Sequence, residues 1–241
     1  MYFGGIQKNS MIDYPGKICC VLFVWGCNYE CPFCHNASLV KVSLKDVLSG
    51  NIVCADDMLQ DVILAFLKKR VHLLDGVVLS GGEPTLQHDI MATCHEIKEL
   101  GYAIKLDTNG SQPDVIQQLI DHQLIDYVAM DIKTSLNKYP TYIGKKVNPF
   151  ILKKSVQLIM DSGLPYEFRT TCVNPIVEEH DIEAITHLIK GAGLYILQKF
   201  IAGPDILKPD DLNLQSAMYD DHTLTHFQSI AAPLVKSCMI R

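Results

Sequence analysis

Residues 18–34 read ICCVLFVWGCNYECPFC, where an apolar run of ten residues, Ile18 to Cys27, leads directly into three closely spaced cysteines. The run predicts a buried strand, and Cys27, Cys31 and Cys34 follow it with the spacing Cys-x3-Cys-x2-Cys. A zinc finger brings four ligands and a disulfide needs an even number of thiols. Three thiolates can instead hold three irons of a 4Fe–4S cluster and leave the fourth iron open for another ligand. The stretch therefore predicts a cluster loop at the end of the first strand.

Other interpretations of the triad are weaker. Residues 31–35 also fit Cys-x-x-Cys-His, the covalent haem attachment motif, but haem of that type is attached after export and Met1 to Lys17 contains no apolar export segment. A zinc site would need a fourth ligand, which His35 supplies only awkwardly beside Cys34. A redox Cys-x-x-Cys pair would leave Cys27 unexplained.

Composition predicts a globular, cytoplasmic protein. The chain has 241 residues, of which 48% are hydrophobic, enough for a single domain with a sizeable core. A formal charge of −6 argues against a nucleic-acid partner, and the ten-residue apolar run is too short for a membrane span. Nine cysteines, an odd number, fit a reducing compartment. The six outside the triad are predicted to be ordinary core or surface residues: Cys19, Cys20, Cys54, Cys94, Cys172 and Cys238.

Short apolar runs alternate with helical patterns along the chain. The predicted strands are 18–25, 76–79, 103–106, 127–130, 166–172 and 195–200. The apolar periodicity predicts helices over Asp56–Arg70 and Asp89–Leu100, with Pro113 and Pro149 in the first turn of two more and Gly163 and Gly191 as helix stops. Strands that alternate with helices predict an α/β fold with a parallel sheet, either a partial barrel or an open doubly wound sheet.

Each predicted strand ends in unusual polar residues, which in α/β barrels is where the chemistry gathers. These segments are the cysteine triad, Gly81-Gly82-Glu83-Pro84, Asp107-Thr108-Asn109-Gly110, Asp131-Ile132-Lys133, Arg169-Thr170-Thr171 and Gln198-Lys199. Each also has a purely structural interpretation: turns at Gly81-Gly82 and at Asp107 to Gly110, an ion pair between Arg169 and Glu167, and another between Asp131 and Lys133. Together they predict one active site.

With these motifs, the sequence resembles the radical S-adenosylmethionine enzymes that activate glycyl-radical proteins. It is most similar to the activating proteins of anaerobic ribonucleoside-triphosphate reductase. The resemblance rests on GIQKNSMIDYPGK at 5–17, Trp25-Gly26-Cys27 and Cys34-His35-Asn36, and it thins after Gly203. The Gly-Gly-Glu-Pro, Thr-Asn-Gly and Asp-x-Lys segments also resemble pyruvate formate-lyase activase.

The resemblance implies a partial (β/α)6 TIM-like barrel with parallel strands, its core at 17–203 and a C-terminal extension at 204–241. It implies one 4Fe–4S cluster per chain on Cys27, Cys31 and Cys34, because no cysteine-rich insert precedes Gly81. The implied S-adenosylmethionine contacts are Phe33, Gly81, Gly82, Glu83, Asp107, Asn109, Asp131, Lys133, Arg169 and Gln198. Of these, Phe33 would lie near the adenine and Gly81 to Glu83 would meet the methionyl amino group. Acids that match Asp107 and Asp131 in pyruvate formate-lyase activase bind a monovalent cation, which becomes a further candidate here.

The implied activity is reductive cleavage of S-adenosylmethionine by the cluster, giving a 5′-deoxyadenosyl radical that generates a glycyl radical on a partner enzyme. The implied partners are anaerobic ribonucleoside-triphosphate reductase and an electron donor such as flavodoxin or ferredoxin. We expect the loop from Asp13 to Gly16 to guide the partner's glycine loop. The alternatives are an activase of the pyruvate formate-lyase type, a small-molecule radical enzyme such as 7-carboxy-7-deazaguanine synthase, and a non-catalytic iron–sulfur electron carrier.

Overall fold

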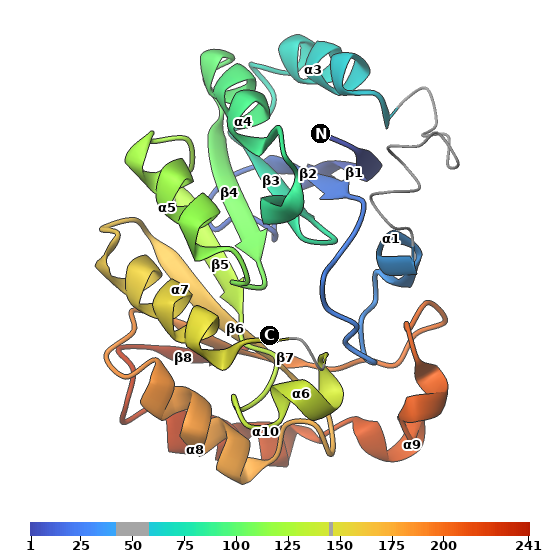
Figure 1. The fold of residues 1–241 in the computed structure, drawn as a ribbon, viewed down its shortest axis with the longest axis vertical. Helices are drawn as coiled ribbons and strands as arrows, with labels where there is room; N and C mark the ends of the chain where they lie inside the picture. Colours follow the sequence, from blue (N-terminus) through green and yellow to red (C-terminus); the bar gives the residue numbers. More distant parts are fainter. Residues whose placement is uncertain (42–57, 145–146) are drawn as a thin grey trace. The chain divides into compact units, whose positions relative to one another are not determined.

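The computed structural model describes residues 1–41, 58–144 and 147–241. Its eight strands follow one another in sequence order, β1 to β8, in one sheet (Figure 1). The described chain forms two compact units, each assembled from several segments. The first unit comprises residues 1–28, 38–108 and 114–128, and the second comprises residues 29–37, 109–113 and 129–241. No helix among the described residues is both long and apolar enough to span a membrane.

The elements of the N-terminal half build a mainly parallel set of strands. They are β1 (Phe3–Ser10), β2 (Cys19–Val24), α1 (Ala37–Lys41), α3 (Gln60–Lys69), β3 (Gly76–Gly81), the 3-10 helix η2 (Pro84–Leu86), α4 (Ile90–Glu99), β4 (Ala103–Thr108) and α5 (Pro113–Asp121). Strand β1 pairs antiparallel with β2, whereas β2, β3 and β4 are parallel neighbours. Their carboxyl ends therefore share one edge, where the segments after Val24, Gly81 and Thr108 begin.

Burial explains why these segments form their elements. Strand β2 is almost entirely buried, as expected for a parallel strand covered on both faces. Helix α3 buries Ile63 and Leu67, and α4 buries Ile90, Cys94 and Ile97, so each presents an apolar stripe to the core. The two helices lie side by side in Figure 1 and are joined by a hydrogen bond from Gln60 Nε2 to Glu96 Oε2 of 2.9 Å.

The C-terminal half continues the pattern. Its elements are β5 (Tyr127–Asp131), α6 (Tyr139–Tyr142), α7 (Pro149–Asp161), β6 (Tyr166–Cys172), α8 (Glu179–Leu188), β7 (Tyr195–Lys199), the 3-10 helix η3 (Pro209–Asp211), α9 (Leu214–Ala217), α10 (Asp221–Ala231) and β8 (Cys238–Ile240). Strands β6, β7 and β8 are parallel neighbours. The chain after Gly203 thus contributes a strand to the sheet, and Arg241 reaches back to the buried carboxylate of Glu167, with Nη2 3.2 Å from Oε2.

The six predicted strands are all present, and Pro113 and Pro149 are the first residues of α5 and α7. Gly163 and Gly191 follow α7 and α8 with positive φ of 73° and 85°, as expected of helix stops. The predicted helix Asp56–Arg70 begins at Gln60, and its first two residues lie outside the described part of the chain. Strands β1 and β8 were not predicted, so the sheet has two more strands than the sequence indicated.

The prediction for the loop from Asp13 to Gly16 is wrong. This loop joins the antiparallel strands β1 and β2, so it precedes β2, whereas the cysteine loop follows β2. Tyr14 is buried, and its ring centroid lies 5.8 Å from that of Tyr127, the first residue of β5. Ile18 N donates to Asp75 Oδ2 at 2.9 Å, just before β3. The loop therefore lies at the amino end of β2, whereas Cys27 follows the carboxyl end of the same strand, so the loop is not positioned to guide a partner's glycine to Cys27.

Candidate active site

In the second unit, Cys31 and Cys34 share one tight turn. Cys34 N donates to Cys31 O at 3.0 Å, and the segment after β7 holds the turn through two further backbone bonds, from Leu207 N to Cys34 O at 3.0 Å and from Lys208 N to Pro32 O at 3.1 Å. Cys31 is buried and Cys34 is half-buried. The turn is thus fixed by backbone bonds.

None of the three cysteines of the triad is part of a disulfide, as is required of cluster ligands. The remaining described cysteines are structural, as predicted. Burial raises the pKa of Cys20, Cys94 and Cys172 to about 12, and that of Cys19 and Cys238 to about 11, so these thiols stay protonated at neutral pH. Cys54 lies outside the described residues.

His35 packs against the segment after β7. Its Nε2 lies 2.8 Å from Ile201 O, so this nitrogen donates a proton to the carbonyl and Nδ1 is the nitrogen that keeps a lone pair. Its ring centroid lies 5.5 Å from that of Phe200. The three thiols of the triad match in number the thiolates that ligate three irons of a 4Fe–4S cluster.

In the first unit, the Gly81-Gly82-Glu83 backbone is bonded to the chain that leads into Cys27. Gly82 N donates to Val24 O at 2.9 Å, and Glu83 N donates to Gly26 O at 2.8 Å. A Cβ atom on Gly82 would lie 2.0 Å from Gly26 O, and one on Gly81, where φ is +104°, would lie 2.5 Å from Val24 N. Both glycines are required because two backbone segments approach too closely for any side chain.

Glu83 is only 1% exposed, and its carboxylate is held by two threonines. Its Oε1 accepts from Thr85 N at 3.2 Å, from Thr85 Oγ1 at 2.5 Å and from Thr108 Oγ1 at 2.7 Å. The side chain thereby ties the start of η2 to the end of β4. The contact of Glu83 with a positively charged amino group stays a prediction. The sequence analysis did not identify Thr85 and Thr108 as partners of Glu83.

Asp107, at the end of β4, is half-buried and contacts Ser80 and Lys105 in the first unit. Ser80 Oγ donates to its Oδ2 at 3.1 Å, and the ammonium group of Lys105 contacts its Oδ1. The sequence analysis named Asp107 but missed Lys105 and Ser80.

In the second unit, Asp131, Lys133 and Arg169 form one network. Asp131 Oδ1 accepts from Arg169 Nε at 2.8 Å, and Asp131 Oδ2 accepts from Lys133 Nζ at 2.9 Å. Burial alone would lower the pKa of Lys133, but Asp131 and the thiols of Cys31 and Cys34 raise it above its ordinary value. A fixed positive charge thus lies near Cys31 and Cys34.

Some of the ion pairs and turns that the sequence analysis gave as purely structural interpretations are present. Asp131 and Lys133 do pair, whereas Arg169 Nη1 is 3.9 Å from Glu167 and its closer partner is Asp131. Asn109 Oδ1 accepts from Ser111 N at 2.9 Å, which is turn chemistry. Gln198 is half-buried beside Thr171, its register partner on β6, and Phe33 is buried.

We expect Gly82→Ala to disable the site while leaving most of the fold intact. The added methyl group would overlap Gly26 O at 2.0 Å and push Gly82 away from Gly26, the residue before Cys27. Iron incorporation should fall to a small fraction of the wild-type value. Gly193→Ala is the matched control, because its Cβ would meet only the Tyr166 ring at 3.8 Å. Equal iron content in the two variants would show that this close approach does not matter for the cluster loop.

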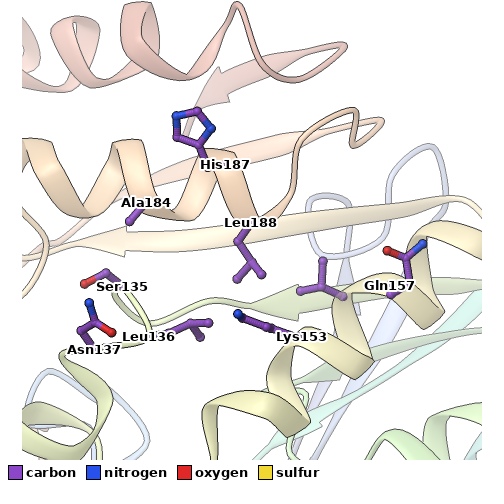
Figure 2. A pocket seen from close by; sticks show the side chains of 9 residues that line it. Ser135, Leu136, Asn137, Lys153, Gln157, Ala184, His187 and Leu188 are labelled. Atoms are coloured by element: carbon purple, nitrogen blue, oxygen red, sulfur yellow. The ribbon is translucent and has the colours of Figure 1, made fainter.

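The hollow drawn in Figure 2 is separate from these residues. It encloses about 530 Å³ and is lined mainly by α7, α8 and the segment after β5. Its polar lining side chains are Ser135, Asn137, Lys153, Gln157 and His187. None of the predicted cluster or cofactor contacts lines it, so the predicted site is not this hollow.

Known proteins resemble this chain over most of its length. The family model described as the radical SAM superfamily matches residues 21–189. A putative glycyl-radical enzyme activating enzyme of Methanocaldococcus jannaschii is 38% identical over 202 residues, which is 81% of this chain and 78% of that protein. The 7-carboxy-7-deazaguanine synthase of Thermococcus kodakarensis is 28% identical over 185 residues, which is 72% of this chain and 70% of that protein.

The fold has a counterpart among solved structures. The crystal structure of Streptococcus suis SuiB bound to S-adenosylmethionine matches with a TM-score of 0.65 and 14% identity. The match covers 90% of this chain and 48% of SuiB. At this identity the likeness concerns the fold alone, and it confirms the predicted α/β class.

Proposed function

We propose a function from the premise that the chain belongs to the radical S-adenosylmethionine superfamily and, within it, to the glycyl-radical-enzyme activating family. The chain would bind a 4Fe–4S cluster and S-adenosylmethionine and generate a glycyl radical on a partner enzyme. The partner that we propose is anaerobic ribonucleoside-triphosphate reductase, because residues 5–17 resemble the activating proteins of that enzyme. A small electron carrier such as flavodoxin or ferredoxin would supply the electron.

One observation carries the proposal for the cluster loop. The backbone of Gly81 to Glu83 is bonded to Val24 and Gly26, and Gly26 directly precedes Cys27, the first cysteine of the triad. A plain iron–sulfur carrier needs no such segment beside its ligands. This arrangement supports a loop that would hold a cluster with a second ligand next to it.

The chain's own residues would then bind and orient the cofactor. Cys27, Cys31 and Cys34 would ligate three irons, and the backbone of Gly81 to Glu83 would bind the methionyl amino group, with the buried Glu83 side chain acting as a positioning group. Arg169 and Lys133 would bind the anionic parts of S-adenosylmethionine while Asp131 fixes their orientation. Phe33 and Gln198 would contact the adenine and the nucleoside, and Asn109 would shape the turn beside Asp107.

The cluster, when bound, supplies the electron that cleaves S-adenosylmethionine reductively. The protein contributes placement and exclusion of water. Because Cys31, Phe33 and Glu83 are buried, side reactions with solvent would be limited. A glycine on a flexible loop is slim enough to reach such a site.

The test is a glycyl radical on the partner. Reduced protein, S-adenosylmethionine and the anaerobic reductase from the same organism, mixed without oxygen, should give the doublet of a glycyl radical by electron paramagnetic resonance. A reductase whose target glycine is replaced by alanine should give no doublet, since the alanyl Cα–H is less accessible. Cleavage of S-adenosylmethionine without any doublet on the reductase would refute the proposed partner.

One relative keeps a second function open. The likeness to a 7-carboxy-7-deazaguanine synthase extends over 72% of this chain, so a small-molecule radical reaction is the alternative. It would be favoured if a small substrate accelerated 5′-deoxyadenosine release while no glycyl-radical enzyme gained a signal. If the reduced, cluster-loaded protein neither bound nor cleaved S-adenosylmethionine, the non-catalytic electron carrier would be the remaining alternative.

A further inference from the structure

Lys105 is a buried lysine at a position where a strand would ordinarily carry an apolar side chain. It lies in the middle of β4, is 1% exposed, and is one of the largest fully buried side chains among the described residues. Its ammonium group contacts Asp107 Oδ1 and lies 6.0 Å from the centroid of the Tyr127 ring. Lysines are almost never fully buried unless they are paired, so the burial of Lys105 depends on its ion pair with the Asp107 carboxylate.

The contacts of Asp107 involve both carboxylate oxygens. Oδ1 meets the Lys105 ammonium and Oδ2 accepts from Ser80 Oγ at 3.1 Å. A monovalent metal ion at Asp107 would need the lone pairs toward which the Lys105 ammonium now directs its N–H groups. The ammonium takes a lone pair of Oδ1, and its positive charge repels a second cation at the same oxygen.

Asp131 shows the same arrangement in the second unit. Arg169 Nε contacts its Oδ1 at 2.8 Å and Lys133 Nζ contacts its Oδ2 at 2.9 Å. Both carboxylates that the resemblance names as cation ligands thus already face positive side chains of the chain itself. The residues present do not fit a site for a monovalent metal ion.

We propose that Lys105 supplies, as a built-in ammonium group, the positive charge that a monovalent cation would otherwise supply beside Asp107, so that cofactor binding by this chain does not depend on monovalent cations. The proposal rests on the proposed function only in taking S-adenosylmethionine as the ligand. Lys105 acts through Asp107 and is a positioning residue.

The first test uses the wild-type protein loaded with its cluster. The dissociation constant of S-adenosylmethionine is measured in potassium chloride and in choline chloride at equal ionic strength. We expect the two values to agree within about twofold, since no cation is linked to binding. A roughly tenfold or larger loss of affinity in choline would overturn the proposal.

The second test removes the ammonium group. Lys105→Ala leaves space beside Asp107, so S-adenosylmethionine should bind roughly tenfold more weakly in choline, with recovery in potassium or ammonium chloride. Lys98→Ala is the matched control, because Lys98 also pairs with an aspartate, Asp126 at 2.8 Å, but nearer the surface. The control should keep the wild-type affinity in both salts. If Lys105→Ala bound S-adenosylmethionine weakly and no small cation restored the affinity, the proposal that the Lys105 ammonium replaces a monovalent cation would be contradicted.

A direct measurement separates this proposal from the proposed function. Binding of thallium(I), a potassium analogue, is followed by ²⁰⁵Tl magnetic resonance without S-adenosylmethionine. We expect no specific binding by the wild-type protein and specific binding by Lys105→Ala that Asp107→Asn abolishes. Thallium binding to the wild-type protein at Asp107 would overturn the proposal even if the radical assay succeeds. If Lys105→Ala fails to fold, the two wild-type measurements decide.

Discussion

Cys31→Ala is expected to abolish iron incorporation, from about four irons per chain to background, because two thiolates cannot hold a cluster that three are needed to ligate. Cys31 is the buried member of the triad, in the turn that Leu207 and Lys208 fix by backbone bonds. Cys94 and Cys172, two described cysteines outside the triad, are poor replacements, since burial keeps their thiols protonated. The cleavage of S-adenosylmethionine should be lost with the iron.

The measurement is iron and sulfide content after anaerobic reconstitution, together with the visible absorption of the cluster and the release of 5′-deoxyadenosine. Cys94→Ala is the matched control, a buried cysteine on α4 whose replacement should leave the iron content unchanged. Cys27→Ala and Cys34→Ala should behave like Cys31→Ala. A Cys31→Ala protein with full iron content would overturn the assignment of the triad.

The parallel strands could be predicted because buried strands have recognisable runs of apolar residues in the sequence. Strands β2, β3 and β5 are short, nearly continuous apolar runs, as strands covered on both faces must be. The triad and the Gly-Gly-Glu-Pro segment were also readable, since close backbone approach and thiolate ligation each require particular residue types.

Strands β1 and β8 could not be recognised in the same way. Strand β1 carries Gly4 and Gly5 and exposes three consecutive residues, and β8 has only three residues. Unless β1 is recognised, the sequence does not show at which end of the sheet the loop from Asp13 to Gly16 lies. The sequence analysis therefore expects this loop at the edge of the predicted active site, whereas the antiparallel pairing of β1 with β2 places it at the amino end of β2.

The partners of the predicted site residues needed the tertiary structure. A lysine in the middle of a strand reads as a solvent-facing residue, and only the pairing of Lys105 with Asp107 makes it part of the core. The available signal was its spacing, because residues two apart in a strand share a face. Thr108 likewise joins Glu83 across 25 positions of sequence, a contact that no local pattern encodes.

Asp131→Asn is expected to destabilise the protein by about 3–5 kcal/mol at neutral pH, because it leaves two largely buried cations without their shared carboxylate. The side chains of Arg169 and Lys133 are 12% and 19% exposed, and each donates to its own oxygen of Asp131. An asparagine has only one oxygen and no charge, so it cannot satisfy both.

The loss should depend on pH in a definite direction. Burial alone would raise the pKa of Asp131, but the Arg169 guanidinium and the Lys133 ammonium outweigh it and hold the pKa well below its ordinary value. A depressed carboxyl pKa contributes stability that is fully present above the unfolded pKa of about 4 and is lost as the pH falls toward the folded pKa. The difference between the wild-type protein and the variant should therefore shrink as the pH falls below about 4.

The measurement is urea denaturation of both proteins at pH 7 and at several lower pH values, under identical anaerobic conditions. Asp161→Asn is the matched control, because Asp161 is an exposed aspartate at the end of α7 whose Oδ2 accepts from its helix neighbour Gln157 at 2.7 Å. It should change the unfolding free energy by less than about 0.5 kcal/mol at every pH. A difference for Asp131→Asn that stays constant or grows as the pH falls would mean that Asp131 is not held ionised by its two cations. A difference as small as the control's would mean that Arg169 and Lys133 find other partners, and that Asp131 does not organise this part of the site.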